Sequence, residues 1–146
     1  MTIGTYEIID QPIDVQKYDQ LLMTKHGAKV IFTGHVREWT FGHQTSYLEY
    51  EAYIDMATKQ LEMIGEEVQQ KFKGVDVSIV HRIGRLDLTD IAVLIITVSP
   101  HRKDCYNANE YVIERIKEVV TIWKKEVYAD GEHWVLGQNQ YRGEEE

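Results

Sequence analysis

Residues 91–120 read IAVLIITVSPHRKDCYNANEYVIERIKEVV, and this stretch decides the fold. Residues 91–98 are apolar and largely β-branched, which is typical of a strand buried on both faces. Residues 104–120 instead place their apolar side chains at helical spacing, on one face of a predicted helix: Cys105, Ala108, Val112, Ile116 and Val119. Asp104 would serve as the N-cap of this helix or as an acid in its first turn.

The same patterns recur on both sides of this stretch. Strands are predicted over residues 3–9, 28–36, 45–53 and 75–83, and helices over residues 14–22 and 54–72. Residues 37–44 are predicted to be a polar loop, and residues 87–90 a polar turn. Residues 123–129 and 132–136 are predicted to form a β-hairpin around Asp130 and Gly131. Hairpins mixed with helices indicate an α+β fold with mostly antiparallel sheet.

Nothing in the sequence divides this fold. The chain contains no internal repeat, low-complexity tract or linker, so residues 1–138 are predicted to form a single domain. Residues 139–146 end in a glycine and three glutamates, and they are expected to be an acidic, disordered tail.

Charge and composition limit the function. The chain of 146 residues has a formal net charge of -8, which argues against non-specific binding to nucleic acid or to an anionic membrane. No apolar run approaches the length of about 18 residues that a membrane span needs, and no secretory signal is apparent, so a cytoplasmic protein is expected. Cys105 is the one cysteine, and no pair of residues has metal-ligand spacing. We therefore expect neither a disulfide, nor a metal, nor a cofactor.

The few basic residues collect at the ends of the predicted elements. They are His35 and Arg37 after one strand, His101, Arg102 and Lys103 before the long helix, Lys117 near its end, and Lys124 and Lys125 in the last hairpin. A helix N-terminus flanked by His and Arg is suited to bind an anion. Taken singly, each residue is more simply explained as a solvated surface cation. Together they favour a site for an anionic small molecule.

Two side-chain features leave alternatives open. Lys117 lies on the flank of its helix, where a lysine normally buries its stem and solvates its amine. A partly buried Lys117 beside other cations would instead have a lowered amine pKa and could transfer protons. Trp39 and Phe41, in a polar stretch, either mark a partner surface or lid, or pin the loop to the core. Cys105 and His81 are expected to be structural.

Short motifs extend the analysis beyond composition. They are GAKVIFTGHVR (27–37), YLEYE (47–51), HRIG (81–84), SPHR (99–102), IK (116–117), WKKE (123–126) and WV (134–135). In this order and at these spacings, the chain resembles the large, catalytic subunits of molybdopterin synthase. The matched motifs run from residue 27 to residue 136, which is most of the chain.

The resemblance implies a fold and an activity. The fold would be an α/β hammerhead with an additional, mostly antiparallel β subdomain. The enzyme would be a sulfurtransferase of molybdenum cofactor biosynthesis. It would move two sulfurs from the thiocarboxylated C-terminus of a small ubiquitin-like carrier, which ends in two glycines, to cyclic pyranopterin monophosphate (precursor Z). The product is the dithiolene of molybdopterin. The catalytic chain would be a homodimer within a heterotetramer, without nucleic acid or membrane as partner.

The resemblance also implies site residues. Lys117 is the first choice for proton transfer beside the carrier's terminal glycine, and Lys124 the second, as an electrostatic stabiliser of the transition state. The substrate-binding set is His35, Val36, Arg37, His101, Arg102, Lys117, Lys124, Lys125 and Glu126. Gln138 stands where some relatives carry arginine. Two other interpretations stay open at this point: a non-catalytic anion-binding scaffold, and a transferase that serves a different ubiquitin-like carrier.

Overall fold

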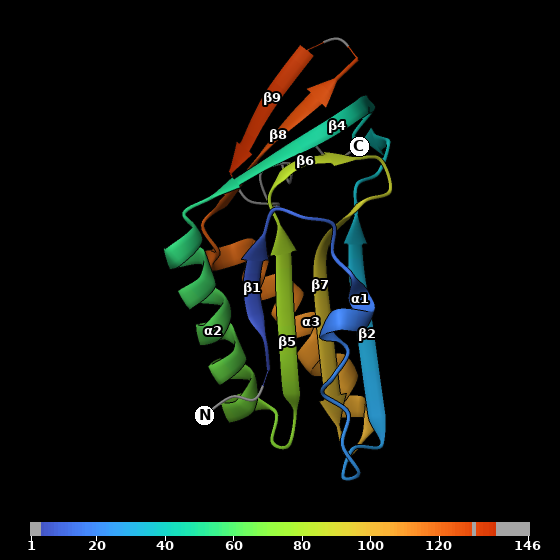
Figure 1. The fold of residues 1–146 in the computed structure, drawn as a ribbon, viewed down its shortest axis with the longest axis vertical. Coiled ribbons are helices and arrows are strands. Elements are labelled where there is room, and N and C mark those ends of the chain that lie inside the picture. Colours follow the sequence, from blue (N-terminus) through green and yellow to red (C-terminus); the bar gives the residue numbers. More distant parts are fainter. Residues whose placement is uncertain (1–3, 130, 137–146) are drawn as a thin grey trace.

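The computed structural model describes residues 4–129 and 131–136, and it is an α+β structure with two sheets (Figure 1). This confirms the predicted fold class. The elements follow one another as β1 (Tyr6–Ile9), α1 (Val15–Tyr18), β2 (Ala28–His35), β3 (Trp39–Thr40), β4 (His43–Ala52), α2 (Ile54–Lys71), β5 (Asp76–Arg82), β6 (Gly84–Asp87), β7 (Ile91–Ser99), α3 (Arg102–Val119), β8 (Ile122–Tyr128) and β9 (Gly131–Leu136).

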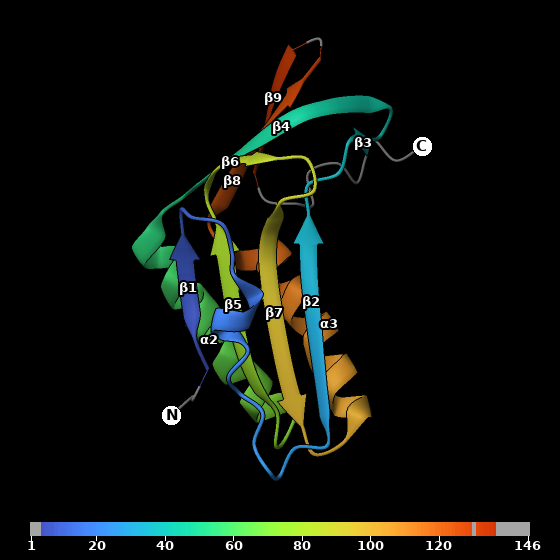
Figure 2. The ribbon, with the colours of Figure 1, turned by 45° about the vertical axis from the view of Figure 1, so that its right-hand side comes forward.

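The first sheet has the strand order β1-β5-β7-β2, and β7 lies inside it. β7 pairs antiparallel with both β5 and β2, whereas β1 and β5 are parallel. Residues 92–99 of β7 are all buried, as the continuous apolar run predicts. Helices α2 and α3 cover one face of this sheet (Figure 2). The other face packs against the segment around α1, through Ile13, Tyr18 and Leu21.

The two long helices bury the stripes that their sequences predict. In α2 the buried side chains are Ala57, Leu61, Ile64 and Val68, and in α3 they are Cys105, Ala108, Val112 and Ile116. Asp104 is an acid in the first turn of α3, while the N-cap is His101. Cys105 is fully buried, and its thiol donates to the Thr97 carbonyl at 3.2 Å. Cys105 is thus a structural residue, as expected.

The second sheet is built around β4, the long strand at the top of Figure 1. β8 and then β9 follow on one side of β4, and β3 and β6 pair with its other side. The predicted hairpin of β8 and β9 is confirmed, although Asp130 in its turn lies outside the described residues. The predicted acidic tail, residues 139–146, also lies outside them, as does Gln138.

Three local predictions were wrong. Helix α1 ends at Tyr18 rather than at residue 22: the C-cap residue Asp19 leaves the helical conformation with a ψ angle of 68°, and its carboxylate forms an ion pair with Lys29 of β2 at 2.8 Å. The stretch 37–44 contains the hairpin of β3 and β4, whose turn residues Phe41 and Gly42 have positive φ angles of 47° and 81°. Residues 84–87 form the extra strand β6, which the sequence does not reveal because only Leu86 among them is buried.

Among the described residues, none of the helices combines the length and the apolar character that crossing a bilayer requires.

His81 offers a test of this fold. It is 1% exposed on β5, its ring packs edge-on against Tyr50, and its Nδ1–H donates to the Arg82 carbonyl at 2.9 Å. Burial lowers the pKa of His81 from 6.5 to about 4. Between these pH values the unfolded chain binds more protons than the folded one. The contribution of neutral, buried His81 to the free energy of unfolding is therefore fully present above pH 6.5 and is lost as the pH falls toward 4.

We therefore expect wild-type protein to lose about 2 kcal/mol of unfolding free energy from His81 between pH 7 and pH 5. The variant His81→Asn keeps a donor for the Arg82 carbonyl but cannot titrate. Urea unfolding of both proteins at the two pH values measures the difference, because every other titrating group is shared. An identical loss in wild type and variant would show that His81 is not held neutral.

Candidate functional site

A pocket of about 460 Å³ lies where the two sheets meet, a size suited to a small organic ligand. Its walls come from the end of β2, the β3–β4 hairpin, β4, β8 and the C-terminal half of α3. Six residues of the predicted site line it: His35, Val36, Arg37, Lys117, Lys124 and Glu126. Residues that are far apart in the sequence thus converge on one cavity.

The floor of the pocket is one face of the β4–β8 ladder. Tyr50 lies opposite Lys124, Leu48 opposite Glu126, and Thr45 opposite Tyr128. Alternation along a strand would place residue 46, not Thr45, on this face. A β-bulge between Thr45 and Tyr47 interrupts this alternation, so that Thr45 is buried in the pocket wall and Ser46 is exposed.

Glu126 is a buried carboxylate within this floor. Its side chain is 2% exposed, and its Oε2 forms an ion pair with Lys124 Nζ at 3.1 Å. The Tyr128 hydroxyl donates to the other oxygen, Oε1, at 2.6 Å. Burial raises the pKa of Tyr50 in the same floor, and the nearby Glu126 carboxylate raises it further, so the Tyr50 hydroxyl stays neutral. Because its two oxygens contact Lys124 and Tyr128, the Glu126 carboxylate faces these side chains rather than the open cavity.

Lys117 enters the pocket from the last turn of α3. It is an exposed residue. Lys117 and Lys124 also border a second, very small cavity that is backed by Tyr50 and His81. The two lysines thus stand side by side on the α3–β8 wall of the site.

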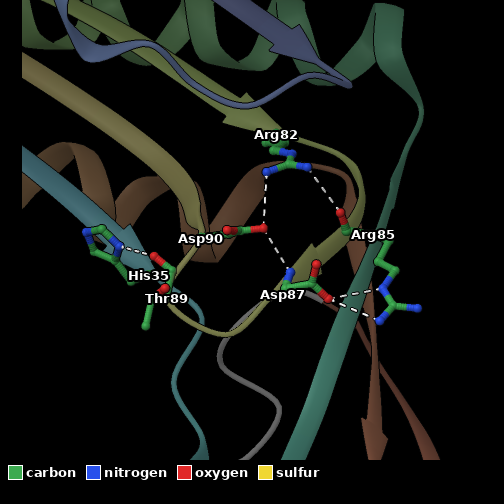
Figure 3. Close-up of polar contacts among 6 residues, drawn as sticks. All are labelled: His35, Arg82, Arg85, Asp87, Thr89 and Asp90. Atoms are coloured by element: carbon green, nitrogen blue, oxygen red, sulfur yellow. Dashed lines mark hydrogen bonds and ion pairs between the residues drawn. The ribbon is translucent and has the colours of Figure 1, made fainter.

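The opposite rim, residues 35–37, is held in place by the turn at residues 87–90 (Figure 3). His35 Nδ1 donates to the Thr89 carbonyl at 2.7 Å, and Val36 exchanges backbone hydrogen bonds with Thr89 and Asp90 at 2.8 and 3.0 Å. Asp90 Oδ2 in turn accepts hydrogen bonds from Arg82 and from the Asp87 amide. Thr89 has a φ angle of 72°, so this network maintains a conformation that is unfavourable for a β-branched residue.

This network gives the rim residues different roles. His35 Nε2 lies 2.8 Å from Thr33 Oγ1, so both ring nitrogens of His35 are engaged within the protein. His35 therefore forms part of the pocket wall rather than a hydrogen-bond donor to a ligand. Arg37 is exposed, and within the described part of the chain its Nε donates to Thr40 Oγ1 at a long 3.4 Å. Arg37 is placed to offer its guanidinium to an anion in the pocket.

Three residues of the predicted set do not line this pocket. Lys125 projects from the other side of β8, where its amine pairs with Glu49 at 3.3 Å, because adjacent strand residues face opposite ways. His101 and Arg102 lie at the start of α3. Fifteen residues separate Arg102 from Lys117 on this helix, a distance of about 22 Å. Within one chain, His101 and Arg102 therefore lie away from the pocket that Lys117 lines.

Several wall residues escaped the sequence analysis. Thr45, Tyr50 and Ile113 line the pocket, and Tyr128 supports Glu126 from behind it. Alternation along β4 and β8 could have placed Tyr50 and Tyr128 on one face. The register that sets Tyr50 opposite Lys124 cannot be read from the alternation within either strand.

The charges of the pocket suit an anion. Arg37, Lys117 and Lys124 surround it, whereas the single carboxylate among its lining residues, Glu126, is buried against Lys124 and Tyr128. This arrangement exists in a chain whose net charge is -8. Within the part of the chain that the structure describes, no three His, Cys, Asp or Glu side chains are grouped as metal ligands.

Comparison with known proteins identifies relatives over most of the chain. The family model of the MoaE protein matches residues 8–119. The molybdopterin synthase catalytic subunit of Staphylococcus aureus (strain COL) is 58% identical over 130 residues, which are 88% of each chain. The crystal structure of molybdopterin synthase from Staphylococcus aureus has a TM-score of 0.86 at 58% identity, over 89% of this chain and 96% of that one.

A more distant structure has the same fold. It is a complex of subunits 1 and 2 of molybdopterin-converting factor from Helicobacter pylori 26695, with a TM-score of 0.72 over 88% of each chain. At 19% identity this likeness shows the fold alone. The family model and the close relatives confirm the resemblance found in the motifs. The chain therefore belongs to the MoaE protein family, an enzyme family whose members are the catalytic subunits of molybdopterin synthase.

Proposed function

We propose that this chain transfers sulfur from the thiocarboxylated C-terminus of a small ubiquitin-like carrier to cyclic pyranopterin monophosphate, and that two such transfers form the molybdopterin dithiolene. The observation that carries this proposal is the pocket of about 460 Å³ with Arg37, Lys117 and Lys124 around it. A cyclic phosphate and a thiocarboxylate are both anions, and three cations favour their joint binding.

Each cationic residue of the pocket has a different role in the reaction. Arg37, exposed at the rim, binds the phosphate. Lys117, with its amine at the α3 wall, takes up and returns protons while the thiocarboxylate sulfur displaces an oxygen from the pterin side chain and the cyclic phosphate opens. Water then cleaves the acyl C–S bond of the thioester, which leaves the sulfur on the pterin and a carboxylate on the carrier. Lys124, held against Glu126 at 3.1 Å, stabilises the negative charge that develops in the transition state. Because the carrier supplies the sulfur, the buried Cys105 takes no part.

The partners follow from the same chemistry. The sulfur donor is a second protein, and its C-terminal tail must reach Lys117. A two-subunit assembly is in keeping with the Helicobacter pylori structure, which is a complex of subunits 1 and 2 of molybdopterin-converting factor. His101 and Arg102 can serve the reaction only in the pocket of a second copy, since about 22 Å separates them from Lys117 within one chain. We therefore propose a homodimer in which each copy contributes its His101 and Arg102 to the pocket of the other copy. One carrier would bind to each copy.

The first test is the variant Lys117→Ala, assayed with thiocarboxylated carrier and cyclic pyranopterin monophosphate, with product detected as its oxidised fluorescent derivative. Loss of the proton-transfer group should lower the single-turnover rate by about 100-fold or more. The unfolding midpoint should not change, because Lys117 is exposed. Lys59→Ala, which removes an exposed lysine of α2 outside the pocket, should react at the wild-type rate. Normal turnover by Lys117→Ala would remove Lys117 from the mechanism.

The exchange of residues between copies is tested by mixing two impaired variants, assayed at a substrate concentration too low for Arg102→Ala to turn over. Arg102→Ala should bind the substrate more weakly, and Lys117→Ala should not turn over. After mixed refolding, heterodimers contain one pocket with both intact residues, so activity should return to about one quarter of wild type. Each variant refolded by itself is the control. A mixture that stays as inactive as its components would place Arg102 outside the neighbouring pocket.

A further inference from the structure

A chain of three polar side chains runs along one face of β8, from the pocket to the strand's outer end. Lys124, Glu126 and Tyr128 alternate along the strand, and successive members are in contact. Lys124 and Glu126 line the pocket, whereas Tyr128 does not. Tyr128 therefore connects to the pocket through Glu126.

The contacts explain why Glu126 needs Tyr128. A carboxylate that is 2% exposed is costly unless both of its oxygens have partners. Oε2 faces Lys124 Nζ at 3.1 Å, and Oε1 accepts from the Tyr128 hydroxyl at 2.6 Å, the length of a strong charge-assisted hydrogen bond. With Oε1 held from behind, the carboxylate has one orientation and presents Oε2 to the lysine.

The ring of Tyr128 is itself fixed. It stacks on the imidazole of His43, with ring centroids 4.6 Å apart and planes inclined by 11°. His43 is the first residue of β4, directly after the turn at Phe41 and Gly42. The tight β3–β4 hairpin thus supports Tyr128, and Tyr128 supports Glu126.

The same chemistry occurs a second time in the molecule, away from the pocket. Tyr111 donates to Glu67 at 2.7 Å, and Glu67 binds Arg115 at 2.9 Å. There the acceptor is 27% exposed, and its partner is an arginine with a planar, preorganised fork. A lysine amine on a flexible stem has no such preorganisation, so the orientation of Lys124 depends more on the carboxylate that it faces.

We infer that Tyr128 is a positioning residue, which holds Glu126 so that the Lys124 amine is fixed against the reacting atoms. The inference rests on the proposed function, and it assigns Glu126 to Lys124 rather than to the substrate. It adds to the site a residue that neither lines the pocket nor belongs to the motifs.

The test is Tyr128→Phe, which removes the hydroxyl and keeps the ring on His43. Loss of a hydrogen bond to a charged group should lower the single-turnover rate at saturating substrate by about ten-fold or more. The Kd for the pterin substrate should stay within about two-fold of wild type, since Tyr128 does not line the pocket. Tyr111→Phe removes a matched hydroxyl outside the pocket and should leave the rate unchanged. Equal rates for Tyr128→Phe and wild type would overturn the inference.

A double variant tests the route through Lys124. In a Lys124→Ala background, adding Tyr128→Phe should lower the rate no further, because the group that Tyr128 positions is gone. A further ten-fold loss would show that Tyr128 acts by another route. If Lys124→Ala by itself reacted at the wild-type rate, the proposed role of Lys124 would fail, and the inference about Tyr128 with it.

A second readout needs no turnover, so it separates this inference from the proposed function. Limited acetylation with acetic anhydride, followed by mass spectrometry, measures how tightly the Lys124 amine is held. Acetylation of Lys124 should be several-fold faster in Tyr128→Phe than in wild type and unchanged in Tyr111→Phe, with Lys59 as internal reference. Equal labelling of Lys124 in wild type and Tyr128→Phe would overturn the inference even if the protein proved to serve another acceptor.

Discussion

The antiparallel pairing of β4 with β8 holds the site together. β4 leads into α2 and β8 follows α3, so this one ladder joins the second sheet to the helices that cover the first. Its register sets Tyr50 opposite Lys124 and Leu48 opposite Glu126, and the bulge at residues 45–47 turns Thr45 to the same face. A slip of one residue would move Lys124 and Glu126 out of the pocket and bring Lys125 in.

Charge inside the pocket is controlled by burial as well as by sequence. Glu126 would weaken an anion site if its carboxylate were open to the cavity, but Lys124 and Tyr128 occupy its two oxygens. On the far rim, Arg82 and Asp90 fix the turn that carries Thr89, and this turn fixes residues 35 and 36 (Figure 3). Arg37 and the two lysines thus project from walls that are braced from behind, which is the preorganisation that electrostatic catalysis requires.

The sequence predicted the elements well where periodicity was strong. The apolar run of β7 and the stripes of α2 and α3 leave little choice of structure. It failed where a tertiary contact decides, as at Asp19, whose ion pair with Lys29 follows the early end of α1, and at β6, which exists only because β4 pairs with it. For the site, six predicted residues meet in one pocket, but motif order could not show that Arg102 lies a helix length from Lys117. Tyr128 escaped notice because a side-chain hydrogen bond such as the one to Glu126 leaves no mark on the hydrophobic pattern.

The central claim is that a carrier tail reaches Lys117 in the pocket bounded by Arg37, Lys117 and Lys124. The most direct measurement is zero-length crosslinking: the carrier, with its C-terminal carboxylate activated by carbodiimide, is incubated with the protein, and the isopeptide bond is mapped by mass spectrometry. The account predicts a bond between the terminal glycine of the carrier and the amine of Lys117, with Lys124 as the minor site. Bonds confined to lysines outside the pocket, such as Lys59 or Lys103, would contradict it.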